Sequence, residues 1–340
     1  MRISPRKHIL FLADISNMSP STKPVQELPS EAAPDLLGEE RAADEAIIRS
    51  LCYSDVFGFP LKLEEIVRFS EMAGLSLELA ANRLKNGKAL HQIVKSDGEF
   101  FYLDGRRGNC EIRRGRETES KRQLQIALRR LIPLQGIPFL RMAAITGALA
   151  ALNSPAGDDI DLLIISSRGR IWTSYLFMRC WRYFGHNPDI CFNVFLSEGD
   201  LIFRNENLFF AREILGSMPV FNRGAFEEFV AANPWIFEIF PSWIPDQERR
   251  SYKLDISPRW QRRQKRLETL LSGPLGNLVE FAARKLQSRI LIGAAPDAAL
   301  GVRRNRIKLH KHDNRSPILD KYDERCRERL TRYRELANQA

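Results

Sequence analysis

Cysteine is scarce in this chain, and long apolar runs are missing from it. The five cysteines lie far apart without a C-x-x-C pair, a pattern typical neither of a disulfide-rich secreted fold nor of a structural zinc site. No stretch reaches the roughly 18 uncharged apolar residues that a membrane helix needs. The apolar run at residues 9–13, behind three basic residues, is shorter than the core of a signal peptide. We therefore expect a cytoplasmic protein without a membrane partner.

The net charge of +10 is concentrated toward the C-terminus. Residues 245–340 hold 23 lysines and arginines against 12 aspartates and glutamates, an excess of 11 that accounts for the whole net charge. A basic region can contact nucleic acid weakly by neutralising phosphates. It can also consist of solvated helices whose arginines pair with neighbouring acids. We predict a basic, helical C-terminal region at residues 244–340 and keep both interpretations.

Two segments with different compositions precede the central part of the chain. Prolines recur among small and polar residues in residues 1–43, which predicts a disordered leader. Residues 44–108 show three helical patterns followed by a hairpin signal at Asp97-Gly98. Three helices and a hairpin are the layout of a winged-helix domain.

A winged helix that binds DNA would place its third helix, residues 76–85, in the major groove. The polar side chains that we expect to be exposed there are Asn82, Arg83, Lys85 and Lys88, together with the acid Glu78. The hairpin tip carries the acids Asp97 and Glu99, whereas a wing that contacts DNA is usually more basic. We therefore expect this domain to dock within the chain or on a protein, and keep DNA contact as the alternative.

A pair of aspartates marks the central part of the chain. After a linking helix at residues 109–130, residues 131–243 begin with an apolar strand, a turn at Gly147 and a loop into a second strand. On that strand Asp159 and Asp161 stand two apart, so both carboxylates project from the same face. Two adjacent like charges need a counter-ion, and Mg²⁺ prefers carboxylate and phosphate oxygens. The strand therefore predicts a divalent-metal site.

The spacing of these residues resembles a known signature. Gly147, the small residue Ala148, a gap of ten residues and the run Asp-Ile-Asp-Leu resemble the motif of the nucleotidyltransferase superfamily related to DNA polymerase beta. Residues 44–330 also resemble a group of uncharacterised bacterial nucleotidyltransferases in the segments CYSDVFGFPLKLEEI, GALAALN and ICFNVFLS. The resemblance implies an α/β (α+β) mixed sheet of nucleotidyltransferase type with flanking helices, an N-terminal winged helix and a helical C-terminal tail.

The resemblance also implies an activity. A nucleoside monophosphate would move from a nucleoside triphosphate to an acceptor that the sequence does not identify. Mg²⁺ or Mn²⁺, held by Asp159 and Asp161, would polarise the α-phosphate and stabilise the leaving pyrophosphate. The turn formed by Gly147 and Ala148, with Asn153 at its end, would bind the nucleotide through backbone N–H groups.

Two departures from the family pattern concern activity. Ala148 stands where the family usually has Ser, so one hydroxyl is missing. Active members usually carry a third acid on a later strand, but the strand at residues 190–197 holds the neutral Asn193. We predict that Asp189, at the entrance of this strand, is the third catalytic carboxylate. Without one, the alternative function is a DNA-binding regulator whose degenerate nucleotidyltransferase domain only binds nucleotide.

The other conspicuous residues have ordinary structural interpretations. We expect Asp158 to end a loop, and the aromatic residues of the segment 171–184 to belong to the core of a crossover helix. His310 and His312, in the basic region, are expected to be solvated.

Overall fold

The computed structural model of the chain describes residues 36–204, 206–294, 302–303, 306–308 and 315–339. Residues 37–340 form one compact unit, with which the following description is concerned. The predicted leader lies outside the described residues except for its last part, and so do His310 and His312.

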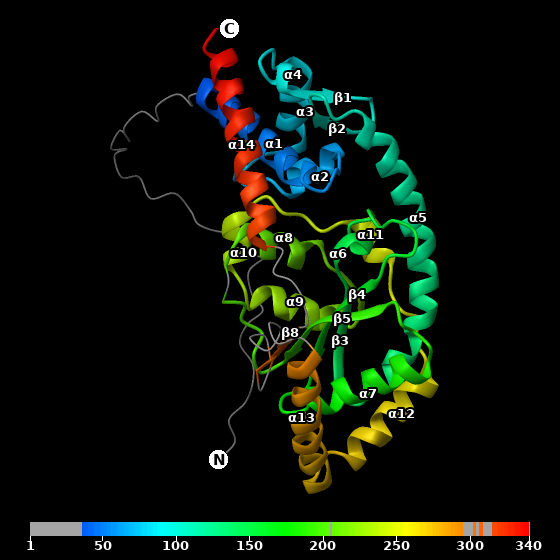
Figure 1. Cartoon of the computed structure of the whole chain (residues 1–340). Helices are drawn as coiled ribbons and strands as arrows, with labels where there is room; N and C mark the ends of the chain where they lie inside the picture. The colour runs from blue at the N-terminus through cyan, green and yellow to red at the C-terminus, as the bar shows by residue number, and fades with distance from the viewer. Residues whose placement is uncertain (1–35, 205, 295–301, 304–305, 309–314, 340) are drawn as a thin grey trace, which may run out of the picture. The chain divides into compact units, whose positions relative to one another are not determined.

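The described chain is a mixed α+β structure (Figure 1). Its helices are α1 (Leu36–Asp55), α2 (Leu63–Arg68), α3 (Leu77–Asn86), α4 (Leu90–Ile93), α5 (Gly108–Leu131), the 3₁₀ helix η1 (Ile132–Gly136), α6 (Gly147–Ala150), α7 (Ile171–Phe184), α8 (Leu208–Gly216), α9 (Arg223–Ala231), α10 (Trp235–Ile239), α11 (Gln247–Ser251), α12 (Pro258–Leu270), α13 (Pro274–Ala294) and α14 (Arg315–Ala337). Its strands are β1 (Val94–Ser96), β2 (Phe101–Leu103), β3 (Leu140–Ile145), β4 (Ile160–Ser166), β5 (Ile190–Ser197), β6 (Met218–Phe221), β7 (Val302–Arg303) and β8 (Arg306–Lys308).

Helices α1 to α4 and the hairpin β1–β2 form an N-terminal module in the predicted order. Helix α1 begins at Leu36, inside the segment predicted as leader. The hairpin turn is centred one residue later than predicted, on Gly98 and Glu99, because the Asp97 backbone N–H donates to the Phe100 carbonyl oxygen. Gly98 alone of the two has a positive φ, +98°, as the first position of a type II′ turn requires.

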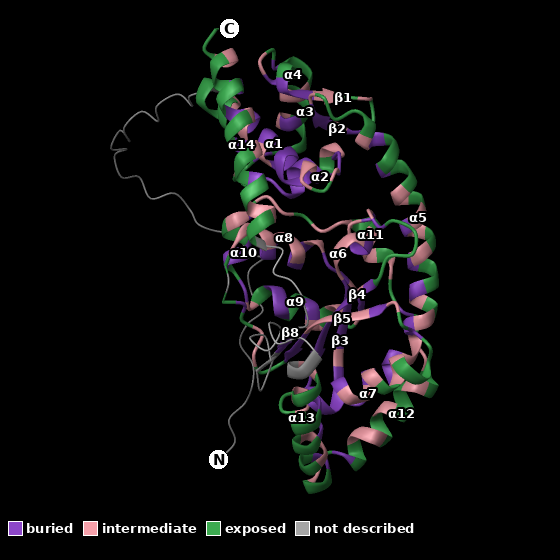
Figure 2. Ribbon diagram, viewed as in Figure 1, coloured by how far each residue is buried: buried purple, intermediate pink, exposed green. Residues whose placement is uncertain are grey.

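Helix α14 completes the core of this module (Figure 2). Four of its side chains are buried in the same cluster as those of α1 and α4: Tyr322, Cys326, Leu330 and Tyr333. The Tyr333 hydroxyl donates to a carboxylate oxygen of Asp44 at 2.8 Å, and the Arg334 guanidinium binds Glu45 through two hydrogen bonds. The arginines of α14 therefore pair with acids from the start of the chain as well as lying in solvent, and α14 is not a free tail.

The central sheet has the strand order β6-β3-β4-β5-β8-β7. Only β4 and β5 are parallel, and α7 forms the crossover that a parallel pair requires. Both faces of β4 are buried: Leu162 and Ile164 belong to one apolar cluster, Leu163 and Ile165 to another. The predicted mixed sheet with flanking helices is confirmed at this level.

Residues 244–340 do not form one helical tail. Strand β8 pairs with β5, which would otherwise expose its edge, and α12 and α13 pack against η1 and α7. Of the aromatic residues predicted for the crossover core, Trp172 and Tyr175 are buried and Phe177 and Trp181 are half-buried, whereas Phe184 at the end of α7 is exposed.

Candidate active site

The turn after β3 lies directly against the start of β4. The Thr146 backbone N–H donates to the Asp161 carbonyl oxygen at 2.9 Å, and Gly147 follows with a φ of +66°. A Cβ atom at position 147 would lie 2.9 Å from Oδ2 of Asp161. Glycine is therefore required at position 147 for two reasons: the backbone conformation there has a positive φ, and the Asp161 carboxylate leaves no room for a Cβ atom. The structure brings together the two sequence features that predicted a site.

Helix α6 begins at this turn and is a single turn long. The side chain of its N-cap residue, Thr146, makes no capping hydrogen bond. The first backbone N–H groups of α6 are therefore not capped by that side chain. Ala148 supplies one of these N–H groups despite the missing hydroxyl. The predicted nucleotide-binding Asn153 lies just beyond α6 and accepts a hydrogen bond from Nη1 of Arg116 on α5 at 3.2 Å. A cationic side chain that the sequence did not single out is thus placed beside the turn.

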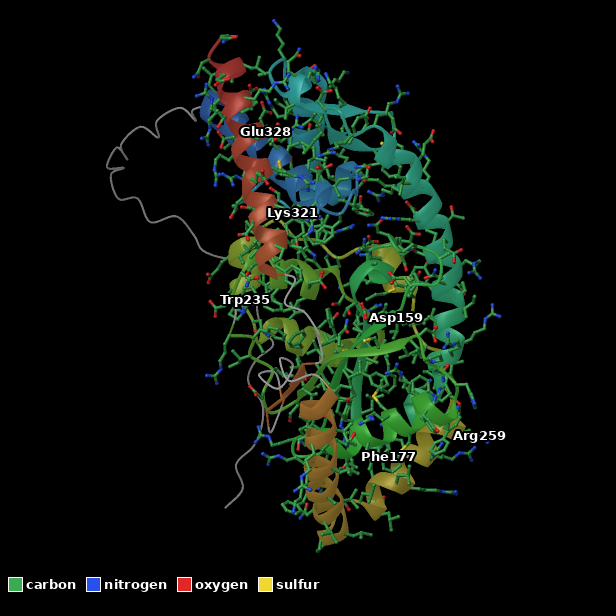
Figure 3. All side chains as sticks on the ribbon, in the orientation of Figure 1. Asp159, Phe177, Trp235, Arg259, Lys321 and Glu328 are labelled. Carbon is green, nitrogen blue, oxygen red and sulfur yellow. The ribbon has the colours of Figure 1, made fainter. Side chains whose placement is uncertain are left out.

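Asp158 and Asp159 lie at the end of an exposed loop that α5 holds in place. Ser154 is buried in that loop, and its backbone N–H donates a hydrogen bond to the Ser120 hydroxyl at 2.9 Å. Asp159 itself is exposed, and its backbone N–H donates to Oδ1 of Asp158 at 3.1 Å. Asp159, labelled in Figure 3, is therefore exposed to solvent, whereas Asp161, two residues later, is half-buried.

Asp161 is the electrostatically strained member of the pair. Burial raises its pKa to about 6, hydrogen bonds from Asn193 oppose the shift, and the charges of Asp158 and Asp159 add to it. In the parallel register Asp161 is paired with Cys191, so Cys191 and Asn193 of β5 lie on the same face. Their side chains are themselves hydrogen-bonded at 3.2 Å. The neutral Asn193 thus takes the place beside Asp161 where a third acid was sought.

Asp189, the predicted third carboxylate, has a different partner. Both of its oxygens accept hydrogen bonds from the Arg130 guanidinium at the end of α5, at 2.5 and 2.6 Å, and Asn187 binds the same guanidinium. These hydrogen bonds hold the pKa of Asp189 below its usual value. A carboxylate engaged in a bidentate ion pair is a weak base. Asp189 therefore anchors α5 to the start of β5 in this structure.

Glu213 on α8 is an acid near Asp161 that the sequence analysis missed. Helix α8 contacts α6, and burial together with the charge of Asp161 raises the pKa of Glu213 to about 7. Within the described part of the chain its carboxylate has no hydrogen-bond partner. A carboxylate whose pKa lies near neutrality can accept a proton at physiological pH. Glu213 is therefore a candidate general base.

The carboxylates do not form a closed metal cage. Among the described residues, no group of three or more His, Cys, Asp or Glu side chains is arranged to hold a metal ion. Asp159 and Asp161 still fit a divalent ion of the kind that completes its shell with water and phosphate oxygens, because Mg²⁺ is commonly held by one or two carboxylates and substrate. Burial and, to a smaller extent, the charges of Asp158 and Asp159 disfavour the ionised form of Asp161, and a bound cation would favour it.

Comparison of the chain with models of protein families, with curated proteins and with solved structures finds no match. No similar protein therefore guides the assignment, and the geometry of the residues around Asp161 carries the functional argument. No helix within the described residues is long and apolar enough to cross a bilayer.

The second candidate surface consists of α3 and the hairpin tip of the N-terminal module, and ion pairs reduce the number of free charges on it. Arg83, one of the four side chains expected to be exposed on the third helix, binds the buried Asp44 through two hydrogen bonds of 2.8 Å. The acids at the hairpin tip are paired as well, since Arg114 of α5 binds both Asp97 and Glu99. The surface thus loses one predicted cation, and its two predicted acids are partly neutralised.

The raised pKa of Asp161 predicts how the stability of the folded protein depends on pH. The folded protein binds the Asp161 proton more tightly than the unfolded chain, so stability falls as the pH rises from about 4 to about 6. Asp161→Asn should therefore raise the free energy of unfolding near pH 7.5 by about 1–2 kcal/mol, less than the full shift implies because the group is partly solvated. Urea denaturation measures the difference. It should vanish near pH 4, where Asp161 is protonated.

The exposed Asp323 of α14 offers a matched control, because Asp323→Asn removes one charge outside the site. Its stability should stay within about 0.5 kcal/mol of the wild type. If Asp161→Asn were destabilised at neutral pH, Asp161 would be a structural residue rather than a strained one.

Proposed function

We propose that the chain is a metal-dependent nucleotidyltransferase that moves a nucleoside monophosphate from a nucleoside triphosphate to an acceptor. The observation that carries the proposal is the contact between the Gly147 turn and Asp161. In this contact, uncapped backbone N–H donors lie beside the carboxylate of Asp161, which forms no ion pair within the described residues. A nucleoside triphosphate with its divalent cation satisfies both groups at once.

Different residues of this chain would have different roles in the proposed transfer. Asp159 and Asp161 would hold Mg²⁺ or Mn²⁺, which supplies Lewis-acid polarisation of the α-phosphate when bound. The N–H groups of Gly147 and Ala148 would bind phosphate oxygens, with the Arg116 guanidinium nearby to neutralise charge. Glu213 would accept the proton of the attacking group, because its carboxylate is near Asp161 and ionises near neutral pH.

Calorimetry of ATP binding tests this proposal. We expect Mg²⁺-dependent binding in the wild type and its loss, by at least about tenfold in Kd, in the double variant Asp159→Asn with Asp161→Asn, because the metal-linked part of the affinity disappears. The variant Asp189→Asn with Asp323→Asn removes the same number of charges elsewhere. Equal affinities of the two double variants for ATP would show that Asp159 and Asp161 do not form the nucleotide site.

The alternative function, a regulator with a winged helix that contacts DNA, is supported by the order of α1 to α4 and the hairpin. The exposed polar residues of α3 and the following turn are Glu78, Asn82, Lys85, Asn86 and Lys88. The ion pairs of Arg83 and the acids of the hairpin tip weaken this interpretation. We therefore prefer the transferase, in which the N-terminal module docks within the chain.

A further inference from the structure

Helices α12 and α13 carry a surface unrelated to the candidate active site. The two helices are joined by three residues (Figure 1). Large apolar side chains are exposed on both sides of this connection. The exposed fractions are 62% for Leu270, 53% for Leu275, 64% for Leu278 and 64% for Phe281. Further along α13, Leu286 and Ile290 are exposed as well. We call this the α12–α13 tip. Solvent-exposed apolar residues that cluster in this way usually mark an interaction surface.

Basic side chains are frequent on the two helices that form the tip. Residues 258–294 contain eight lysines and arginines and two glutamates, a net charge of +6. Five of the basic residues lie on α12 and are exposed: Arg259, Arg262, Arg263, Lys265 and Arg266. Figure 3 labels the first of them, Arg259. Within the described part of the chain, none of these five forms an ion pair with an acid. The positive charge of α12 is therefore available to a partner.

The two glutamates are used inside the protein. Glu268 accepts a hydrogen bond from the Phe139 backbone N–H at 2.7 Å and pairs with Arg141. Glu280 accepts hydrogen bonds from the first N–H groups of α7, at Trp172 and Thr173. Both acids thus attach helices α12 and α13 to the sheet domain. The outward side of these two helices keeps its positive charge.

Aromatic side chains adjoin the same basic helix. An open groove of about 450 Å³ between α7 and α12 is lined by Phe184, Trp260 and Arg263, among others. Tyr183, beside Phe184 at the end of α7, is 77% exposed. Aromatic rings with an apolar body, close to arginines, are enriched where proteins meet the interface of a bilayer.

We propose that the α12–α13 tip binds the surface of a membrane rich in anionic lipids. The leucines and Phe281 would enter the boundary between head groups and acyl chains, while the arginines of α12 bind lipid phosphates. A second copy of the chain is a poorer partner, because a symmetric contact would bring two surfaces of charge +6 together. Nucleic acid matches the arginines but offers no apolar surface to Leu275 and Leu278. This proposal departs from the prediction of no membrane partner and is independent of the proposed transferase activity.

Flotation of the full chain with lipid vesicles tests the proposal. We expect binding to vesicles of phosphatidylcholine mixed with phosphatidylglycerol, much weaker binding to phosphatidylcholine alone, and a loss of binding at high salt. Leu278→Glu should lower the partition coefficient at least about tenfold, because it places a charge in the inserting tip. Arg262→Glu with Arg266→Glu should have a similar effect, since each basic residue contributes about a factor of five.

Matched variants separate this surface from general effects. Leu77→Glu changes an exposed leucine of α3, and Arg327→Glu with Arg332→Glu changes two exposed arginines of α14. Both should bind vesicles like the wild type. Circular dichroism verifies that each variant is folded.

Three outcomes would overturn the proposal. The first is a wild type that does not float with anionic vesicles, and the second is a Leu278→Glu variant that floats equally well. The third is a wild-type dimer in light scattering that Leu278→Glu dissociates, without any vesicle binding, which would assign the tip to self-association. Salt-sensitive RNA binding that only the arginine variant loses would, in the absence of flotation, assign α12 to nucleic acid.

Discussion

Glu213→Gln should lower the rate of nucleotidyl transfer by a factor of about 10² to 10⁴ while leaving the affinity for nucleotide within about threefold of the wild type. The glutamine keeps the shape of the side chain on α8 but cannot accept a proton. Because the charge of Asp161 and burial raise the pKa of Glu213 to about 7, the rate of the wild type should rise with pH through about 7 and then level off. Single-turnover transfer of labelled nucleotide, with a cell extract as the source of acceptor, measures both quantities.

Asp189→Asn is the informative comparison for Glu213→Gln. If Asp189 were the base, as the sequence predicts, its variant would lose transfer and the Glu213 variant would not. The ion pair with Arg130 leads us to expect the opposite order, with Asp189→Asn active and less stable by about 1–3 kcal/mol. An unchanged rate in Glu213→Gln would remove Glu213 from the mechanism.

Arg113→Met should lower the free energy of unfolding by about 3–5 kcal/mol, the largest change in stability that we expect from a single charge removal in this chain. The guanidinium is buried between the rings of Phe59 and Phe100, at 4.0 and 4.4 Å, and binds both oxygens of Glu65. Burial by itself would raise the pKa of Glu65, but the Arg113 charge and hydrogen bonds hold it below its usual value. Without Arg113, Glu65 would be a buried, unpaired charge.

The pH dependence of this defect has a definite sign. In the wild type the paired carboxylate contributes stability that is present above the unfolded pKa and is lost as the pH falls through the lower, folded pKa. In Arg113→Met the carboxylate is unpaired, so the defect should be larger near pH 8 than near pH 5, where protonation relieves it. Denaturant titrations at the two pH values measure the change.

Two further variants show whether the defect comes from Glu65. Adding Glu65→Gln to Arg113→Met should restore most of the lost stability, because the unpaired charge is removed. Arg114→Met removes the neighbouring, exposed arginine and its ion pairs with Asp97 and Glu99, at a cost of about 0–1 kcal/mol. Equal losses in the two single variants would mean that the buried pair contributes no more than a surface pair.

The local part of the candidate site could be predicted from the sequence. A strand, a turn at Gly147 and an adjoining strand determine which side chains meet, so the closeness of Gly147 and Asp161 follows from nearby residues. The N-terminal order of helices and hairpin follows from periodicity and from Asp97-Gly98, within one residue of the observed turn. In both cases the interacting residues are close to one another along the chain.

The partners that come from distant segments could not be predicted. Arg130 reaches Asp189 only because α5 ends beside β5, and nothing in the pattern of either segment shows this. One feature of the sequence could have indicated Glu213. Arg212 and Glu213 are the only charged residues in the otherwise apolar α8. Two adjacent charges in a buried helix need partners, and Arg212 finds Tyr53, Phe69 and the Ser54 hydroxyl of the N-terminal module. A charge in an apolar helix thus indicates a contact without naming its partner.

The position of α14 determines when the N-terminal module can be completed during synthesis. Its core contains Leu330 and Tyr333, so the ribosome must synthesise the chain as far as α14 before this core can close. At translation rates of about 5–20 residues per second, α1 and the hairpin wait on the order of ten seconds or more for α14. During that interval the apolar face that later receives α14 is uncovered, while the sheet domain has time to assemble. The sheet domain is in this sense an insertion between two pieces of one module, and a nascent chain stalled before residue 315 would carry an unfinished module that chaperones can bind.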